Sequence, residues 1–203
     1  MNGGLRESVK AFVRGAATLA VVPALISYFV RSRFVGRDRA LEGSSEALAL
    51  IPGFIGQYLR RAFFARTLLH CAPTAVIGFG TLFSKAGARL DDHVYVGPRC
   101  HLGLVHLESN VLLAAGVHVP SGPNTHGTDP SMPIRDQPGT LRMVRIGAGS
   151  WVGSNAVILA DVGRDTIVAA GAVVTTELPD RVIAAGVPAR VVKLRDADVT
   201  AVS

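Results

Sequence analysis

The feature that most restricts the fold of this chain is a six-residue period that begins after residue 75. Aliphatic or aromatic residues open successive units, and nine of the twelve steps between them, within two runs, are six residues long. These residues are Ile77, Phe83, Leu90, Val96, Leu102, Leu107, Leu113 and Val119, then Ile146, Val152, Ile158, Val162, Val168 and Val174. Six is a multiple of the strand period of two and fits 3.6 poorly, so the pattern excludes an ordinary α-helix.

Most units carry a small or β-branched residue four positions after the first. These residues are Thr81, Gly87, Val94, Cys100, Val111, Val117, Ser150, Ala156, Thr166 and Ala172. The combination predicts a three-sided coil of short strands, in which the first residue points inward and the small residue fills the corner. A β-sandwich would show alternating segments of irregular length and hairpin turns, and neither is evident. We therefore expect an all-β parallel β-helix over about residues 76–175.

A long interruption, residues 120–145, separates the two runs. It contains five prolines and many polar residues. Because a loop of this length inside a compact repeat is usually functional, we expect an ordered loop that projects from the prism.

The first 71 residues have a different character, which predicts a helical extension. Residues 15–30 are uncharged and are flanked by arginines and a lysine, but as a helix they reach only about 24 Å, short of the roughly 30 Å core of a bilayer. Pro23 further disfavours a straight span. No signal-peptide cleavage pattern follows, so we expect the segment to be retained. A second helix is expected from Pro52 to about Leu69, and residues 37–45 are expected to link the two.

The net charge of +6 comes entirely from this part of the chain. Residues 1–75 contain ten Lys or Arg against four Asp or Glu, whereas residues 76–203 contain eleven of each. A basic, apolar segment favours an anionic membrane over nucleic acid as its partner. The alternative is that the helices pack on the prism or between subunits. We expect a helical segment over 1–71, a β-helix domain over 72–195 and a tail over 196–203. Cys71 and Cys100 offer no disulfide framework.

Four segments give the chain a specific resemblance. They are SGPNTHGTD, VRIGAGSWVGSNAVI, IVAAGAVVT and AAGVPARVVK, in this order. Together they resemble the hexapeptide-repeat acyltransferases, above all the galactoside and maltose O-acetyltransferases. The N-terminal third more loosely resembles what precedes this fold in enzymes that modify bacterial surface polysaccharides.

The resemblance implies a left-handed β-helix that assembles as a homotrimer and transfers an acetyl group from acetyl-CoA to a hydroxyl between subunits. The family's catalytic histidine falls on His126, and an imidazole, which ordinarily ionises near pH 6.5, suits a general base at neutral pH. His101 aligns with a position that contacts the acceptor. His101 and His118 hold equivalent places in their units, so we expect them to stack on adjacent coils at one corner.

For CoA, the resemblance implies one group of residues along the pantetheine and adenine and another at the phosphates. The first group is Ser154, Ala170, Thr175 and Thr176, and the second is Arg190 and Lys193. The family often has Lys where Thr176 stands, and Arg195 is a candidate to replace that contact. We expect Trp151 to form a wall of the cleft.

The sequence leaves the acceptor open among polysaccharide sugars, lipid-linked sugars and a xenobiotic such as an antibiotic. Two further alternatives are a non-catalytic scaffold and a zinc carbonic anhydrase of the same fold, in which His101, His106 and His126 would bind the metal. We expect no metal, because the short step from Leu102 to Leu107 places His101 and His106 on different corners. Since acetyl-CoA is cytoplasmic, we expect the protein in the cytoplasm, at the inner face of the inner membrane.

Overall fold

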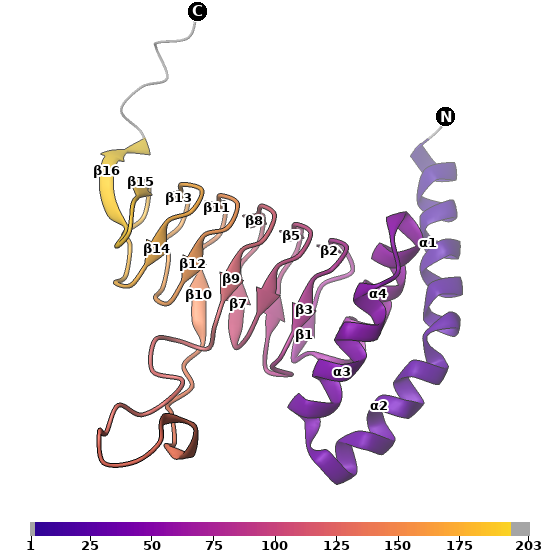
Figure 1. The fold of residues 1–203 in the computed structure, drawn as a ribbon. Helices are drawn as coiled ribbons and strands as arrows, with labels where there is room; N and C mark the ends of the chain where they lie inside the picture. Colours follow the sequence, from indigo (N-terminus) through magenta and orange to yellow (C-terminus); the bar gives the residue numbers. More distant parts are fainter. Residues whose placement is uncertain (1–2, 196–203) are drawn as a thin grey trace, which may run out of the picture.

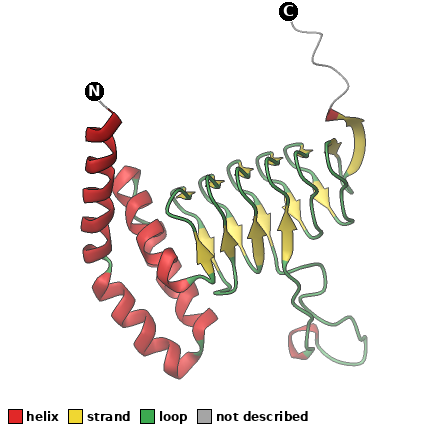
Figure 2. Ribbon diagram, turned by 180° about the vertical axis from the view of Figure 1, so that it is seen from behind, coloured by secondary structure: helices red, strands yellow, loops and turns green. Residues whose placement is uncertain are grey.

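The computed structural model describes residues 3–195, which form a triangular prism of short strands preceded by helices (Figure 1). The helices stand at one end of the prism, and a long loop projects from one of its edges (Figure 2). The helices are α1 (Gly3–Ala20), α2 (Val22–Val35), α3 (Arg37–Ala49) and α4 (Gly53–Thr67). The tail predicted over 196–203 lies outside the described residues.

Three sheets form the sides of the prism, and all of their strands are parallel except the last. Sheet A contains β1 (His70–Cys71), β4 (Arg89–Leu90), β7 (Val105–Leu107) and β10 (Val144–Ile146). Sheet B contains β2 (Val76–Ile77), β5 (Tyr95–Val96), β8 (Leu112–Leu113), β11 (Trp151–Val152), β13 (Ile167–Val168), β15 (Val182–Ala185) and β16 (Arg190–Leu194). Sheet C contains β3 (Leu82–Phe83), β6 (His101–Leu102), β9 (His118–Val119), β12 (Val157–Ile158) and β14 (Val173–Val174).

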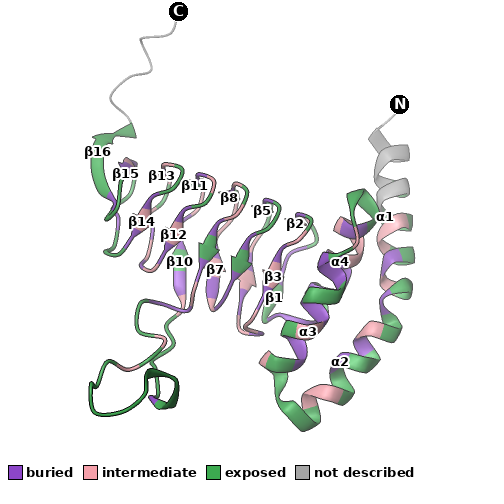
Figure 3. Ribbon diagram, viewed as in Figure 1, coloured by how far each residue is buried: buried purple, intermediate pink, exposed green. Residues whose placement is uncertain are grey.

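The six-residue period determines what lies inside this prism. Every residue that opens a unit is buried, and buried positions recur along the coils of the prism (Figure 3). The corner residues are buried as well, with one correction: Gly87 is only partly buried, and Ala88 fills that corner, because the step from Phe83 to Leu90 is seven residues long. The prediction of a left-handed parallel β-helix is confirmed.

Hydroxyl groups at the corners tie successive coils together. The Oγ1 of Thr81 donates to the carbonyl of Gly97 at 2.8 Å, and the Oγ of Ser150 donates to that of Gly163 at 2.7 Å. A buried hydroxyl without a partner would cost about 1–3 kcal/mol, so these bonds allow a polar side chain to fill a corner.

The expected linker over residues 37–45 is wrong, because these residues form most of α3. The chain breaks instead at Gly36, whose φ of 84° favours glycine. The two serines that suggested a linker are buried: Ser44 donates to the carbonyl of Ala40, and Ser45 accepts a 2.8 Å bond from the amide of Phe83. The bond to Ser45 joins α3 to the first coil.

Helix α4 attaches the helical segment to the prism. Phe63 and Phe64 are fully buried, and the ring of Phe64 lies 4.7 Å from that of Phe83. Arg60 is also fully buried, and it donates hydrogen bonds to carbonyls of α3, of the turn that follows α3 and of β2. Phe63, Phe64 and Arg60 of α4 therefore pack on the prism, which is one of the two roles predicted for the helical segment.

Helices α1 and α2 meet at a bend of 48°. Among the described residues, no single helix is long and apolar enough to cross a membrane, whereas the bent pair Ala11–Ala20 and Val22–Val35 reaches the required length and composition together. The bend lies beside Pro23, in the first turn of α2.

Candidate active site

A groove of about 290 Å³ lies where sheet C, the projecting loop and α3 meet. Its lining includes Glu42 of α3, Ser84 and Lys85 after β3, His101 and His118 of sheet C, and Thr125 of the loop. Segments from three distant parts of the sequence therefore form one concave surface.

His101 and His118 occupy outward positions on neighbouring strands. They are paired in the register of β6 and β9, and their rings stack 5.1 Å apart at an interplanar angle of 8°. The predicted stacking is thus observed, although on the face of sheet C and not at a corner. Burial, and secondarily the nearby His101, lowers the pKa of His118 below its ordinary value. A neutral imidazole is therefore favoured at His118.

His126 follows Thr125 in the loop, and its side chain is exposed. The amide of Thr140 donates to the carbonyl of Asn124 at 2.8 Å, which holds the two arms of the loop together. Gly139 packs directly against the backbone of Thr125 and His126, where a Cβ would collide. The backbone of His126 is therefore held next to the groove by the returning arm.

Gln137 supports the outer part of the loop, a role that no motif in the sequence indicated. Its buried side chain accepts a bond from the amide of Asp129 at 2.8 Å and donates to the carbonyls of Asp129 and Met132. Two hydrogen bonds from Ser131 lower the pKa of the exposed Asp129. The loop is thus ordered by its own polar contacts.

The structure brings some of the residues assigned to CoA together. Ser154 and Ala170 lie at the same corner between sheets B and C, on adjacent coils, and the amide of Gly171 donates to the carbonyl of Ser154 at 2.8 Å. Thr175 and Thr176 follow β14 and are exposed at the opposite edge of sheet C. None of these four residues lines the groove beside the loop.

Arg190 and Lys193 lie on β16, which closes the C-terminal end of sheet B. Arg190 pairs with Ala185 and Lys193 with Ile183, both on β15 of sheet B. The amide of Ala189, just before Arg190, donates to the carbonyl of Val173 on sheet C. Arg195, the candidate replacement, donates to the carbonyl of Asp165 at 2.7 Å. Its guanidinium is therefore held between sheets A and B.

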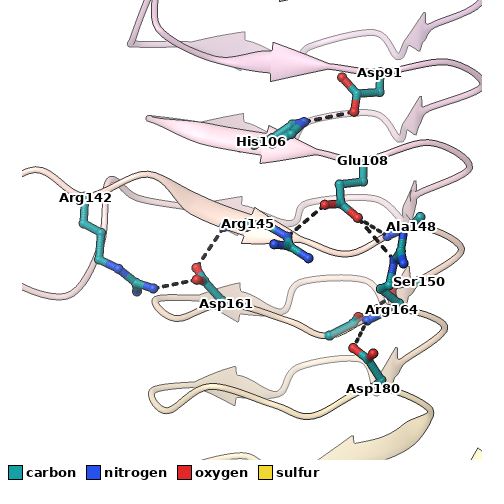
Figure 4. Close-up of polar contacts among 11 residues, drawn as sticks. Asp91, His106, Glu108, Arg142, Arg145, Ala148, Ser150, Asp161, Arg164 and Asp180 are labelled. Atoms are coloured by element: carbon teal, nitrogen blue, oxygen red, sulfur yellow. Dashed lines mark hydrogen bonds and ion pairs between the residues drawn. The ribbon is translucent and has the colours of Figure 1, made fainter.

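Sheet A carries a network of charged side chains (Figure 4). His106 lies 2.9 Å from a carboxylate oxygen of Asp91, and Glu108 accepts from Arg145 and from the amide of Ala148, both at 2.9 Å. His106 and His101 are on different sheets. Within residues 3–195, no group of three or more His, Cys, Asp or Glu residues could hold a metal ion.

Sheet B presents an apolar outer face. Tyr95, Leu112 and Trp151 are paired in register on adjacent strands, and each is exposed by more than two fifths. Trp151 therefore lies on a different side of the prism from the groove of the same chain.

Comparison with known proteins gives short but informative matches. The chain is 41% identical over 69 residues to a protein named probable acetyltransferase from Mycobacterium tuberculosis, which covers 33% of this chain and 23% of that protein. It is 42% identical over 52 residues to the galactoside O-acetyltransferase of Escherichia coli, which covers 25% of this chain and 26% of the relative. The aligned part thus spans only about a quarter of each of these relatives. No protein-family model matches the chain.

Solved structures extend the likeness over most of the fold. A maltose O-acetyltransferase from Clostridium difficile superposes with a TM-score of 0.65 at 17% identity, over 77% of this chain and 87% of that one. A galactoside acetyltransferase in complex with coenzyme A gives 0.62 at 19% identity, over 80% and 84%. The chain has the hexapeptide-repeat fold of these acetyltransferases. The resemblance predicted from the four sequence segments is therefore confirmed.

Proposed function

We propose that this protein is a CoA-dependent O-acetyltransferase that acetylates a hydroxyl of a sugar. The observation that carries the proposal is the groove at sheet C, where paired histidines meet the loop that bears His126, within the fold of known acetyltransferases. A groove lined by hydroxyl, imidazole, ammonium and carboxylate groups suits a polar, polyhydroxylated acceptor.

In this proposal His126 is the general base. Its neutral imidazole takes the proton from the acceptor hydroxyl as the oxygen attacks the thioester carbonyl of acetyl-CoA. The new ester bond forms, the C–S bond breaks, and the departing CoA thiolate takes up the proton that His126 accepted. The contacts of Gly139 and Gln137 support this role, because they hold the backbone around His126 without covering its side chain. His101 would bind the acceptor within the groove.

For the co-substrate, the proposed path runs along the corner of Ser154 and Ala170 toward Thr175, Thr176 and Arg190. Small residues at that corner would let the narrow pantetheine arm approach backbone donors. Arg190 and Lys193 would meet the phosphates, for which basic side chains are suited.

The same proposal includes a homotrimer with active sites between subunits. Two features support it. The CoA path does not line the groove of its own chain, and sheet B carries the exposed apolar row of Tyr95, Leu112 and Trp151. Contact between subunits would cover that row and place Trp151 in a cleft beside a neighbouring chain.

We further propose that the acceptor is a polysaccharide precursor or lipid-linked glycan, modified at the cytoplasmic face of the inner membrane. The exposed apolar residues of α1 and α2, such as Phe12, Ile26 and Phe34, lie on helices rich in arginine. A membrane with anionic lipids would contact such a surface.

The decisive experiment replaces His126 with Asn. Turnover should fall by about two to four powers of ten, because the base is lost, while CoA affinity measured by calorimetry should stay unchanged. The assay follows release of the CoA thiol with a panel of galactosides and other sugars.

A matched control is His93→Asn. His93 is exposed at a corner between sheets A and B with a φ of 60°, a conformation that Asn adopts readily, and its turnover should equal that of the unsubstituted protein. Near-normal turnover of His126→Asn would remove His126 from the mechanism, and the absence of any sugar-dependent turnover by the unsubstituted protein would contradict the sugar acceptor.

A further inference from the structure

A second pocket lies between α4, α1 and the first coil. It has a volume of about 210 Å³ and is lined by two arginines, Arg14 and Arg61, together with polar and aromatic groups that include Gln57, Tyr58 and Thr74. It shares no residue with the groove at sheet C.

Among the side chains that the structure describes, Ser8 and residues 11–195, neither arginine of this pocket forms an ion pair, and the buried Nε of Arg61 has no hydrogen-bond partner. Burial, and next the positive charge of Arg14, lowers the pKa of Arg61. Two guanidinium groups that repel each other in a partly buried pocket would gain free energy from an anion that bridges them.

An apolar groove of about 450 Å³ continues from this pocket between α1 and α4. The pocket and the groove share Phe54 and Tyr58. The rest of the groove is lined by small or aliphatic side chains of α1 between Val13 and Ala20, and by Ile55 and Leu59 of α4. In both views of the ribbon, α1 and α4 lie side by side (Figures 1 and 2).

We propose that the pocket and groove together form a binding site for one anionic phospholipid, with its phosphate on Arg14 and Arg61 and an acyl chain along the α1–α4 groove. Charge complementarity at the mouth and the apolar character of the groove both fit such an amphiphile. Exposed apolar side chains surround the site, and Phe54, Ile55 and Leu19 are each exposed by more than 70%. In a bilayer these side chains would be buried in lipid while the arginines hold the headgroup.

This site goes beyond the proposed function, because it requires no acyl transfer and uses no residue of the groove at sheet C. A second copy of the chain is the competing occupant of the apolar groove. The two arginines favour the lipid, since no side chain described for residues 8 and 11–195 forms an ion pair with them and a purely apolar contact between copies would supply no counter-ion.

The test measures binding of dihexanoyl phosphatidylglycerol, a water-soluble lipid, to the full chain by calorimetry. The unsubstituted protein should bind it more tightly than dihexanoyl phosphatidylcholine, which lacks net charge, and more tightly than inorganic phosphate, which lacks a chain. Arg14→Gln with Arg61→Gln should weaken binding by about tenfold or more, as expected when charge-assisted hydrogen bonds are lost. Ala16→Trp, which fills the groove without removing charge, should weaken binding of the phosphatidylglycerol but not of inorganic phosphate.

The matched control is Arg33→Gln with Arg39→Gln, which removes the same charge from exposed positions outside the pocket. It should leave the affinity within about twofold, because distant exposed charges contribute little. Arg14→Gln alone provides a milder variant if the double substitution lowers the melting temperature.

Three results would overturn the site: equal loss of binding in the control and in the Arg14/Arg61 variant, equal affinity for the two lipids, or no lipid binding by a folded protein. In the last case, sedimentation of the unsubstituted protein beside Ala16→Trp would show whether a second copy fills the groove. None of these outcomes depends on turnover, so failure of the proposed acetyl transfer is recognised separately by the His126 experiment.

Discussion

Sheets A and C carry histidines that look alike in the sequence but have opposite surroundings. On sheet A, His106 is 2.9 Å from Asp91, and the carboxylate of Glu108 is paired with Arg145 and accepts from the backbone amide of Ala148 (Figure 4). On sheet C, His101 and His118 stack on each other and face a groove. The difference indicates that the outer side chains of sheet A stabilise the stack of coils, while those of sheet C are available to a ligand.

The largest effect that separates the two sheets is expected at Glu108. This side chain accepts from the amide of Ala148 and pairs with Arg145 and, at 3.8 Å, Arg164, and only 17% of it is exposed. Glu108→Ala should lower the free energy of unfolding by about 1–3 kcal/mol, because a partly buried amide loses its charged acceptor. Urea denaturation measures this loss.

Glu108→Gln serves as the control. It keeps an acceptor for the amide of Ala148 and should therefore destabilise less than Glu108→Ala, and neither variant should change the KM for the acceptor. A full-stability Glu108→Ala variant would show that the network on sheet A does not hold the coils together.

A smaller effect is expected at His101, and on a different quantity. His101→Asn should raise the KM for a sugar acceptor by roughly two- to tenfold with little change in kcat. This is the effect of losing one hydrogen bond of about 0.5–1.5 kcal/mol that is equally strong in the bound ground state and in the transition state. Its unfolding free energy should stay close to that of the unsubstituted protein. A stability loss without any change in KM would place His101 with the structural residues of sheet A.

The sequence predicted the inside of the prism far better than its outside. Every inward residue that the six-residue period selected is buried, because the period reports a repeated, local geometry. The pairing of His101 and His118 followed from the same register. The corner was misplaced at Gly87 because one step of the period is seven residues long. The helix at 37–45 was missed because local composition disagreed with long-range packing, as with Ser45, whose hydroxyl accepts from the amide of Phe83.

The candidate site was predictable only in part, for a physical reason. His126 and the residues assigned to CoA came from a resemblance, since nothing local distinguishes a catalytic histidine from a solvated one. The groove itself joins Glu42, Lys85 and Thr125, which are far apart in the sequence. The pocket of Arg14 and Arg61 likewise lies between two helices, and no periodicity in the sequence predicts that these helices contact each other.

The smallest expected effect is a pH dependence of the free energy of unfolding that arises from His118 on sheet C. Burial, and secondarily His101, lowers the pKa of His118 in the folded protein, so the unfolded chain binds a proton at a higher pH than the folded one. As far as His118 determines it, the free energy of unfolding should therefore be highest above about pH 6.5, the ordinary pKa of histidine. It should fall as the pH drops from there toward the lowered pKa of His118. Urea midpoints measured across this range test the sign. His118→Asn should remove this contribution, whereas His101→Asn should remove only the lesser part, because burial is the larger cause. If the urea midpoint of His118→Asn varied with pH as steeply as that of the unsubstituted protein, the pH dependence would belong to other groups. Burial and the nearby His101 would then have no measurable effect on the protonation of His118.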